Sequence, residues 1–170
     1  MMKRIALILI PILVLFFGGC DIFPTPPTSS GVVITIYPNP VHFDTEKKGW
    51  YYNIEIKNIE DETIHLSKIE IRGIIKYLVF NLPIPDEDYD VAKIKEVFGK
   101  ADVAPGETIK GVEGYTEGDI ENFLEDLPSY PGLDTESAIG GLNVNIRIRG
   151  FTESGDYIEA TSGTILFSNK

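Results

Sequence analysis

Three aspartates at alternate positions, Asp86, Asp88 and Asp90, form the densest group of metal-binding side chains in the sequence. Carboxylate oxygens are the ligands that calcium prefers. A calcium loop of the EF-hand type needs Gly at its sixth position and Glu at its twelfth, and counting from Asp86 these places hold Val91 and Val97. The spacing therefore leaves two interpretations, a looser loop stabilised by Ca²⁺ or a solvated helix start.

A second group of side chains is suited to recognising a partner. Arg147 and Arg149 alternate with isoleucines in a predicted strand, so they point outward as a basic stripe on an acidic protein. We expect them to pair with carboxylates on a neighbouring strand or to dock an acidic partner. Tyr51 takes an outward position in another predicted strand. It belongs either to the rim of the core or to a surface that holds a sugar or a protein.

The sequence offers little to a catalytic mechanism. It has no G-x-S-x-G nucleophile elbow, and its two histidines, His42 and His65, fall in different segments. Cys20 is the only cysteine, so neither an internal disulfide nor a zinc site is expected. We predict no catalytic residues and no enzymatic activity.

The first twenty residues have the composition of an export signal. Lys3 and Arg4 precede an uncharged, largely apolar segment at 5–17, and Gly18 and Gly19 follow it. Thirteen residues rise only about 20 Å as a helix, whereas a bilayer core is roughly 30 Å thick. A membrane span is therefore a weaker interpretation than a cleaved signal.

The segment Phe17-Gly18-Gly19-Cys20 resembles the lipobox of bacterial lipoproteins, although Leu is commoner than Phe at its first position. The resemblance implies removal of residues 1–19, a diacylglycerol on the Cys20 sulfur and an acylated amino group, such as a palmitate. It places the protein at the bacterial cell envelope, anchored to the membrane by lipid. Asp21 resembles an inner-membrane retention signal of enterobacterial lipoproteins, and the leaflet stays open. A plain signal peptide cut near Gly19 is the alternative.

Residues 20–31 contain the lipidated Cys and a segment rich in Pro, Ser and Thr. Eleven extended residues reach roughly 30 Å, so this segment is predicted to be a tether. Loss of residues 1–19 removes two of the 15 basic residues and leaves 13 against 26 acidic ones, a net charge of −13. Nucleic acid is excluded as a partner because its binding needs a basic surface.

Beyond the tether, apolar and polar residues alternate with the period of half-buried strands. A parity change near Ser67 indicates a bulge. Two segments change to a helical period, 86–98 and 116–127, the second with Thr116 and Asp119 placed as a capping box. The expected strands cover residues 32–37, 50–59, 63–72, 74–82, 108–115, 142–151 and 157–167.

These strands predict a mainly β domain over residues 32–170, with a short helical insertion at about 86–127. The N-x-x-D turn at 58–61 and the A-P-G-E-T segment at 104–108 resemble those of bacterial immunoglobulin-like and fibronectin type III-like modules. The resemblance implies an immunoglobulin-like antiparallel β-sandwich of about seven strands.

The sequence as a whole predicts a lipid-anchored envelope protein whose β-sandwich is a binding or assembly module for an envelope protein or a glycan. The alternatives are a structural or accessory lipoprotein within a larger complex, and a carbohydrate-binding or hydrolytic domain. The membrane is the expected partner of the anchor. Apart from the lipid on Cys20 and the Ca²⁺ hypothesis for Asp86, Asp88 and Asp90, no cofactor is expected.

Overall fold

Strands dominate the computed structural model, which describes residues 31–126, 130 and 132–168, so the prediction of a mainly β domain is confirmed. The helices are α1 (Val91–Phe98), α2 (Glu117–Glu125) and α3 (Thr135–Gly141). The strands are β1 (Val32–Tyr37), β2 (Val41–Asp44), β3 (Gly49–Asn58), β4 (Ile64–Tyr77), β5 (Phe80–Pro83), β6 (Glu87–Tyr89), β7 (Asp102–Val103), β8 (Thr108–Thr116), β9 (Leu142–Thr152), β10 (Tyr157–Thr161) and β11 (Ile165–Ser168).

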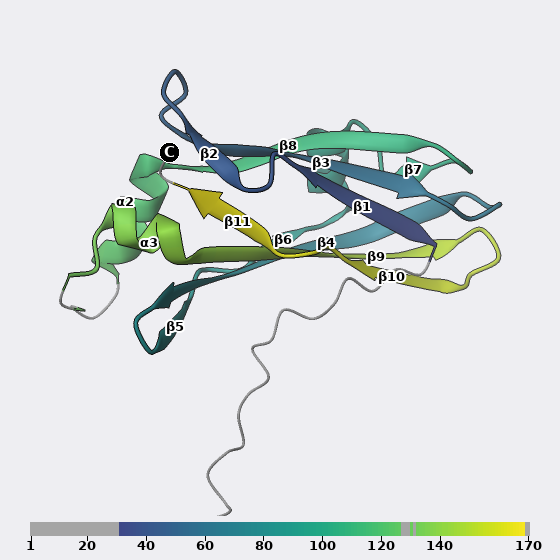
Figure 1. Cartoon of the computed structure of the whole chain (residues 1–170). Coiled ribbons are helices and arrows are strands. Elements are labelled where there is room, and N and C mark those ends of the chain that lie inside the picture. Colours follow the sequence, from purple (N-terminus) through teal and green to yellow (C-terminus); the bar gives the residue numbers. More distant parts are fainter. Residues whose placement is uncertain (1–30, 127–129, 131, 169–170) are drawn as a thin grey trace, which may run out of the picture.

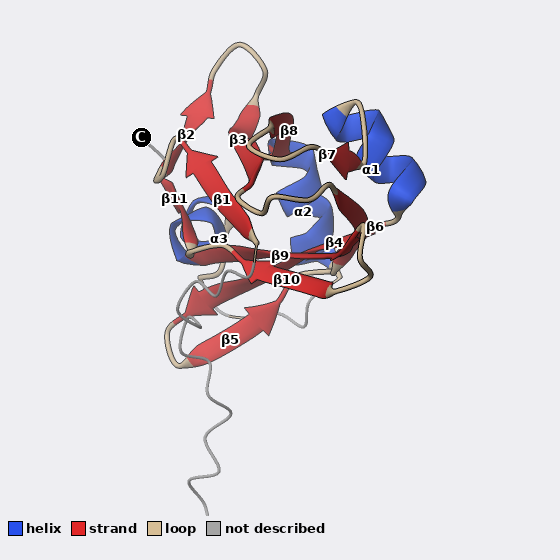
Figure 2. Ribbon diagram, turned by 90° about the vertical axis from the view of Figure 1, so that its right-hand side faces the viewer, coloured by secondary structure: helices blue, strands red, loops and turns tan. Residues whose placement is uncertain are grey.

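The strands lie in two layers that face each other, an upper one with β1, β3 and β8 and a lower one with β4, β9 and β10 (Figure 1). In the upper layer β3 pairs with β8, β1 and β2; in the lower layer β4 pairs with β9, β5, β6 and β7. The short strand β11 pairs with β9 and with β2, so it joins the two layers at one side. Figure 2 shows α1, β6 and β7 at the opposite side.

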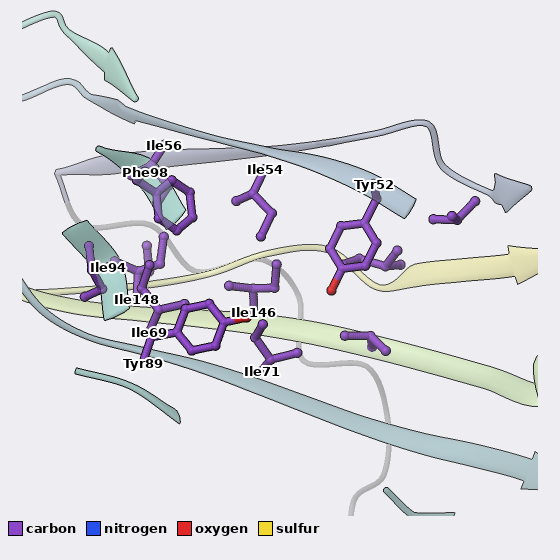
Figure 3. Packing of buried hydrophobic residues seen from close by; sticks show 14 of the residues in the cluster. Tyr52, Ile54, Ile56, Ile69, Ile71, Tyr89, Ile94, Phe98, Ile146 and Ile148 are labelled. Atoms are coloured by element: carbon purple, nitrogen blue, oxygen red, sulfur yellow. The ribbon is translucent and has the colours of Figure 1, made fainter. Parts of the chain in front are cut away.

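The core fills the space between the layers with aliphatic and aromatic side chains. Tyr52, Ile54 and Ile56 of β3 point down toward isoleucines of β4 and β9, and α1 closes one end with Ile94 and Phe98 (Figure 3). These side chains are buried because the period of two in each strand places its apolar residues on one face. The outer faces carry polar side chains together with exposed apolar ones such as Val33, Val112 and Phe151.

Local sequence signals set the helix ends. Asp90 accepts a hydrogen bond from the Lys93 amide at 2.9 Å and begins α1, and Gly99 ends it in the left-handed conformation. Thr116 and Asp119 form the predicted capping box of α2. The predicted bulge is also confirmed, as a register shift between Leu66 and Lys68.

Several details of the sequence interpretation are wrong. Residues 74–82 are not one strand but the end of β4, a turn and most of β5. Residues 87–89 are strand β6 rather than a helix start, and α3 is a helix in a segment where neither a helix nor a strand was expected. The last expected strand breaks into β10 and β11, and β2, β6 and β7 were not expected, so the described residues form eleven strands and not about seven. Because β11 runs parallel to β2, the sheet is mixed and not wholly antiparallel.

Candidate functional site

The outer side of the lower layer gathers most of the charged residues that the sequence singled out. We call this surface the charged face. It is built by alternate residues of β4, β9 and β10 and by the segment at β6, and its members are Lys68, Glu70, Arg72, Asp86, Asp88, Arg147, Arg149 and Glu159.

Glu70 occupies the centre of the charged face and is only 6% exposed. Its carboxylate lies 2.9 Å from Lys68 Nζ and 3.3 Å from guanidinium nitrogens of Arg72 and Arg149. A buried carboxylate is tolerated only where cations and hydrogen bonds replace its lost hydration. The three cations therefore allow the charged side chain of Glu70 to be buried on the face of the sheet.

Asp86 and Asp88 reach the charged face from the β6 side. Arg72 donates to Asp88 at 2.8 Å and lies 3.3 Å from Asp86, and Lys68 lies 2.9 Å from Asp88. Hydrogen bonds from Lys68 and Arg72 hold the pKa of Asp88 below its ordinary value. Asp90 is directed elsewhere, to the start of α1.

Asp86 and Asp88 of the calcium hypothesis thus share Arg72 as a partner, whereas Asp90 caps α1. Within residues 31–126, 130 and 132–168, no group of three or more His, Cys, Asp or Glu side chains is arranged to hold a metal ion. The structure brings Asp86 and Asp88 to basic side chains and not to a common centre with Asp90. Calcium binding stays a hypothesis without a ligand set among these residues.

Arg147 and Arg149 confirm the prediction of cross-strand pairing to different degrees. Arg149 contacts Glu70 at 3.3 Å and donates to Glu159 of β10 at 3.2 Å. Arg147 approaches the same two carboxylates only to 3.9 Å, which is beyond hydrogen-bonding distance. Its side chain is 45% exposed. Arg147 is therefore the less firmly paired of the two arginines.

A hollow of about 380 Å³ lies beside Arg147 and is lined by Glu70, Arg72, Asn145 and Thr161 as well. Guanidinium, amide and hydroxyl groups donate hydrogen bonds in fixed directions. The hollow suits a carboxylate or another small polar group of a partner. Tyr51 does not contribute to it, because this residue belongs to β3 in the upper layer, where the ammonium of Lys47 lies 5.3 Å from its ring.

A second concave site lies between α2 and the segment from β5 to β6. We call it the acidic-aromatic pocket; it has a volume of about 340 Å³ and buried Ile84 and Ile120 among its lining residues. The remaining side chains that matter here are Glu87, Tyr115, Asp119, Asn122, Phe123 and Asp126. Ligand pockets typically combine such apolar walls with a few polar groups.

The electrostatics of the acidic-aromatic pocket are dominated by carboxylates. Burial raises the pKa of the Tyr115 phenol, and the nearby charges of Glu87, Glu113 and Asp119 raise it further. Burial also raises the pKa of Glu113, while a hydrogen bond from Tyr89 acts in the opposite direction. The local field therefore favours neutral or cationic ligand groups over anionic ones.

The residues of this pocket were not identified from the sequence. From the sequence, Asp119 is expected only as part of the capping box at the start of α2. The available signal was the polar side of α2, where Asn122 and Asp126 are four residues apart and so share one face. Nothing local indicates that β6 lies opposite that face.

Cys20 and residues 1–19, the expected anchor and signal, lie outside the described residues. Among the residues that are described, none of the helices has the length and apolar character needed to cross a membrane.

Comparison with known proteins does not assign a family. No family model and no curated protein matches the chain. Solved structures similar to it include red sea bream transglutaminase (12% identity, TM-score 0.47) and a Northeast Structural Genomics Consortium target (12%, 0.44). They also include Listeria innocua β-glucosidase in complex with gluconolactone (13%, 0.37). The alignments cover 83%, 84% and 81% of this chain, and 17%, 86% and 16% of the respective structures. The chain thus spans about a sixth of the transglutaminase and the glucosidase, and at these identities and TM-scores the likenesses assign no function.

Proposed function

We propose that this chain is a lipid-anchored protein of the bacterial envelope whose β domain binds a glycan in the acidic-aromatic pocket. The observation that carries the proposal is the combination of Phe123 and Tyr115 with the exposed carboxylates and amide of Glu87, Asp126 and Asn122 around one cavity. Sugars present both an apolar C–H face and a set of hydroxyl groups, and this pocket offers a counterpart to each.

The charges of the pocket narrow the class of glycan. Carboxylates accept hydrogen bonds from sugar hydroxyls, and Asn122 both donates and accepts. A ligand carboxylate would meet Glu87, Asp119 and Asp126 and would be repelled. Neutral sugars and amino sugars are therefore preferred over uronic acids.

Binding fits the pocket better than hydrolysis does. A glycosidase needs two carboxyl groups held at a fixed separation, one of which acts as an acid. One oxygen of Asp119 already accepts hydrogen bonds from the Thr116 amide at 2.8 Å and hydroxyl at 2.7 Å. The helix cap holds this carboxylate in a structural role, so Asp119 is not available as either member of that pair.

Titration calorimetry with neutral oligosaccharides tests the proposal, with tetramers of N-acetylglucosamine and of glucose as probes. Phe123→Ala is expected to weaken binding about tenfold, which corresponds to 1.4 kcal/mol. Phe151→Ala is the matched control, because Phe151 is 44% exposed and lies on β9, away from the pocket. Absence of binding to either probe, or equal losses in both variants, would contradict the proposal and favour a structural or accessory role.

The envelope location and the finer fold class are part of the same proposal. The lipobox-like segment ending at Cys20 supports anchoring, and Cys20→Ala is expected to abolish metabolic labelling with palmitate. The two facing layers and the A-P-G-E-T segment, in the turn before β8, support an immunoglobulin-like sandwich. The parallel pairing of β2 with β11 is a departure that any such classification must accommodate.

A second function, docking of an envelope protein on the charged face, is favoured by the weak pairing of Arg147 beside an open hollow. Crosslinking in native membranes followed by mass spectrometry would identify the partner. Arg147→Glu and Arg149→Glu are expected to abolish that crosslink, whereas Lys95→Glu, an exposed change on α1, should preserve it. Retention of the crosslink in both arginine variants would exclude the charged face.

A further inference from the structure

The turn between β4 and β5 exposes three consecutive apolar side chains, which we call the apolar tip. Leu78 is 81% exposed, Val79 88% and Phe80 45%. Single exposed apolar residues are common in soluble proteins and need no explanation. A run of three at the end of a hairpin is different, because together the three side chains form one continuous exposed apolar surface.

The conformation of the turn makes this composition more unusual. Tyr77 pairs with Phe80, so the loop itself consists of Leu78 and Val79. Two-residue hairpin loops favour Asn, Asp and Gly because they require positive φ angles. Leu78 nevertheless adopts a φ of 52°. The turn therefore carries a leucine that fits its backbone poorly, and both loop residues bury little of their own surface.

The surroundings of the apolar tip suit an interface between water and hydrocarbon. Residues 74–83 contain one charged residue, Lys76, and no carboxylate, although the whole chain has 26 acidic residues against 15 basic ones. The Phe80 ring contacts that of Tyr130, with 5.2 Å between their centroids. Tyrosine rings are enriched at headgroup level because they are apolar with one polar end, and lysine extends its ammonium toward water.

The shape of the hairpin distinguishes a lipid surface from a protein partner. Figures 1 and 2 both show β5 and its turn standing out from the lower layer, on the side away from the upper layer. A stable protein interface buries about 800 Å² on each partner, which requires a broad surface. Fluid lipid closes around a narrow projection, and apolar side chains insert into the boundary between headgroups and acyl chains.

We propose that the apolar tip is a membrane-contact site that inserts Leu78, Val79 and Phe80 into the outer part of a lipid bilayer. This contact is separate from the expected anchor at Cys20 and from glycan binding. It would fix the orientation of the β domain on the membrane, since a flexible tether alone leaves the orientation free.

Depth-dependent quenching tests this insertion in the full-length protein. Val79→Trp is reconstituted in vesicles of phosphatidylcholine and phosphatidylglycerol, with and without bromine at shallow carbons of the acyl chains. The emission of Trp50, which is 4% exposed, is measured in the parent protein and subtracted. Phe80→Trp gives a second probe if Val79→Trp folds poorly. Glu46→Trp, in the exposed turn between β2 and β3, is the control in an equally anchored protein.

The expected result is a blue shift and bromine quenching of the tryptophan at the tip, with an unchanged spectrum at position 46. Absence of quenching at both tip positions would overturn the proposal. Equal quenching at the tip and at position 46 would also overturn it, because the domain would then lie close to lipid without local insertion. A blue shift that brominated lipid does not quench would assign the tip to a protein contact instead.

Discussion

Glu70→Gln is the most direct test of the electrostatic design of the charged face. The substitution keeps the shape of the side chain and removes its charge. Lys68, Arg72 and Arg149 then lose the carboxylate that lies 2.9–3.3 Å from each of them. The new amide also directs an N–H₂ donor toward at least one of these cations, which are donors themselves, whereas both oxygens of the carboxylate were acceptors.

The size of the effect follows from the burial of each partner. Removing one member of a fully buried ion pair costs about 3–5 kcal/mol, whereas exposed pairs contribute about 0–1 kcal/mol. Glu70 is 6% exposed, but the side chains of its three cations are 31–37% exposed and can regain some hydration. Asp88 and Glu159 also continue to pair with them. We therefore expect a loss of about 2 kcal/mol, between the two limits.

Thermal unfolding followed by circular dichroism measures this loss. For a domain of about 140 residues, 2 kcal/mol corresponds to a decrease in Tm of roughly 6–10 °C. Glu96→Gln is the matched control, because Glu96 is 69% exposed and pairs with Lys93 within α1. Its expected cost is below about 0.5 kcal/mol. If both variants unfold at the same temperature, the expected loss is contradicted and the buried pairing of Glu70 contributes nothing net to stability.

Three further predictions concern other parts of the structure. Thr116→Ala should cost about 1 kcal/mol in urea unfolding because α2 loses its cap, and Thr116→Ser should restore most of it; equal stability of the two would contradict the capping role. Gly114→Ala should cost about 3 kcal/mol or more, since an added Cβ would lie 2.2 Å from the Trp50 carbonyl oxygen. A Tm within 2 °C of the parent's, as for a cost of about 0.5 kcal/mol or less, would show that β8 shifts easily. The pKa of the Asp88 carboxyl is lower in the folded state than its ordinary value of 3.8. Its ion pairs therefore stabilise the fold fully at pH values above 3.8, and this stabilisation is lost as the pH falls below 3.8 and through the lowered pKa. The stability difference between the parent and Asp88→Asn should therefore be largest near neutral pH and disappear in acid, and a difference independent of pH would refute the assignment.

Elements with strong local signals could be predicted from the sequence. The strict alternation in β3 and β9 placed Tyr52 and Ile146 in the core, and the capping box marked the start of α2. The β4–β5 hairpin could not be found in this way, because Leu78 and Val79 carry none of the residues typical of a turn. The acidic residues before α1 were misread for a related reason, since acidic side chains favour both helix starts and exposed edge strands.

The charged face shows where sequence reasoning about the site ends. The parity of Arg147 and Arg149 predicted that they point outward and pair with carboxylates; the pairing is close for Arg149, whereas Arg147 lies 3.9 Å from its carboxylates. The identity of Glu70 as a shared partner depends on the register between β4 and β9, which pairs Glu70 with Arg147 across 77 positions of sequence. Register between distant strands is set by the packing of the whole core, so no local pattern reveals it.

The position of the acidic-aromatic pocket follows from how the two layers are joined. β11 bonds to both β2 and β9, so the layers are linked at one side and the other side must be covered by different elements. A helix cannot continue the backbone hydrogen bonds of a strand at the edge of a sheet. The space between such a helix and the strand is therefore filled by side chains alone. The pocket lies at such a seam, where α2 faces the segment from β5 to β6. A ligand held there would contact both the helix and the strand segment, and binding should therefore stabilise the end of the domain that the sheet does not close.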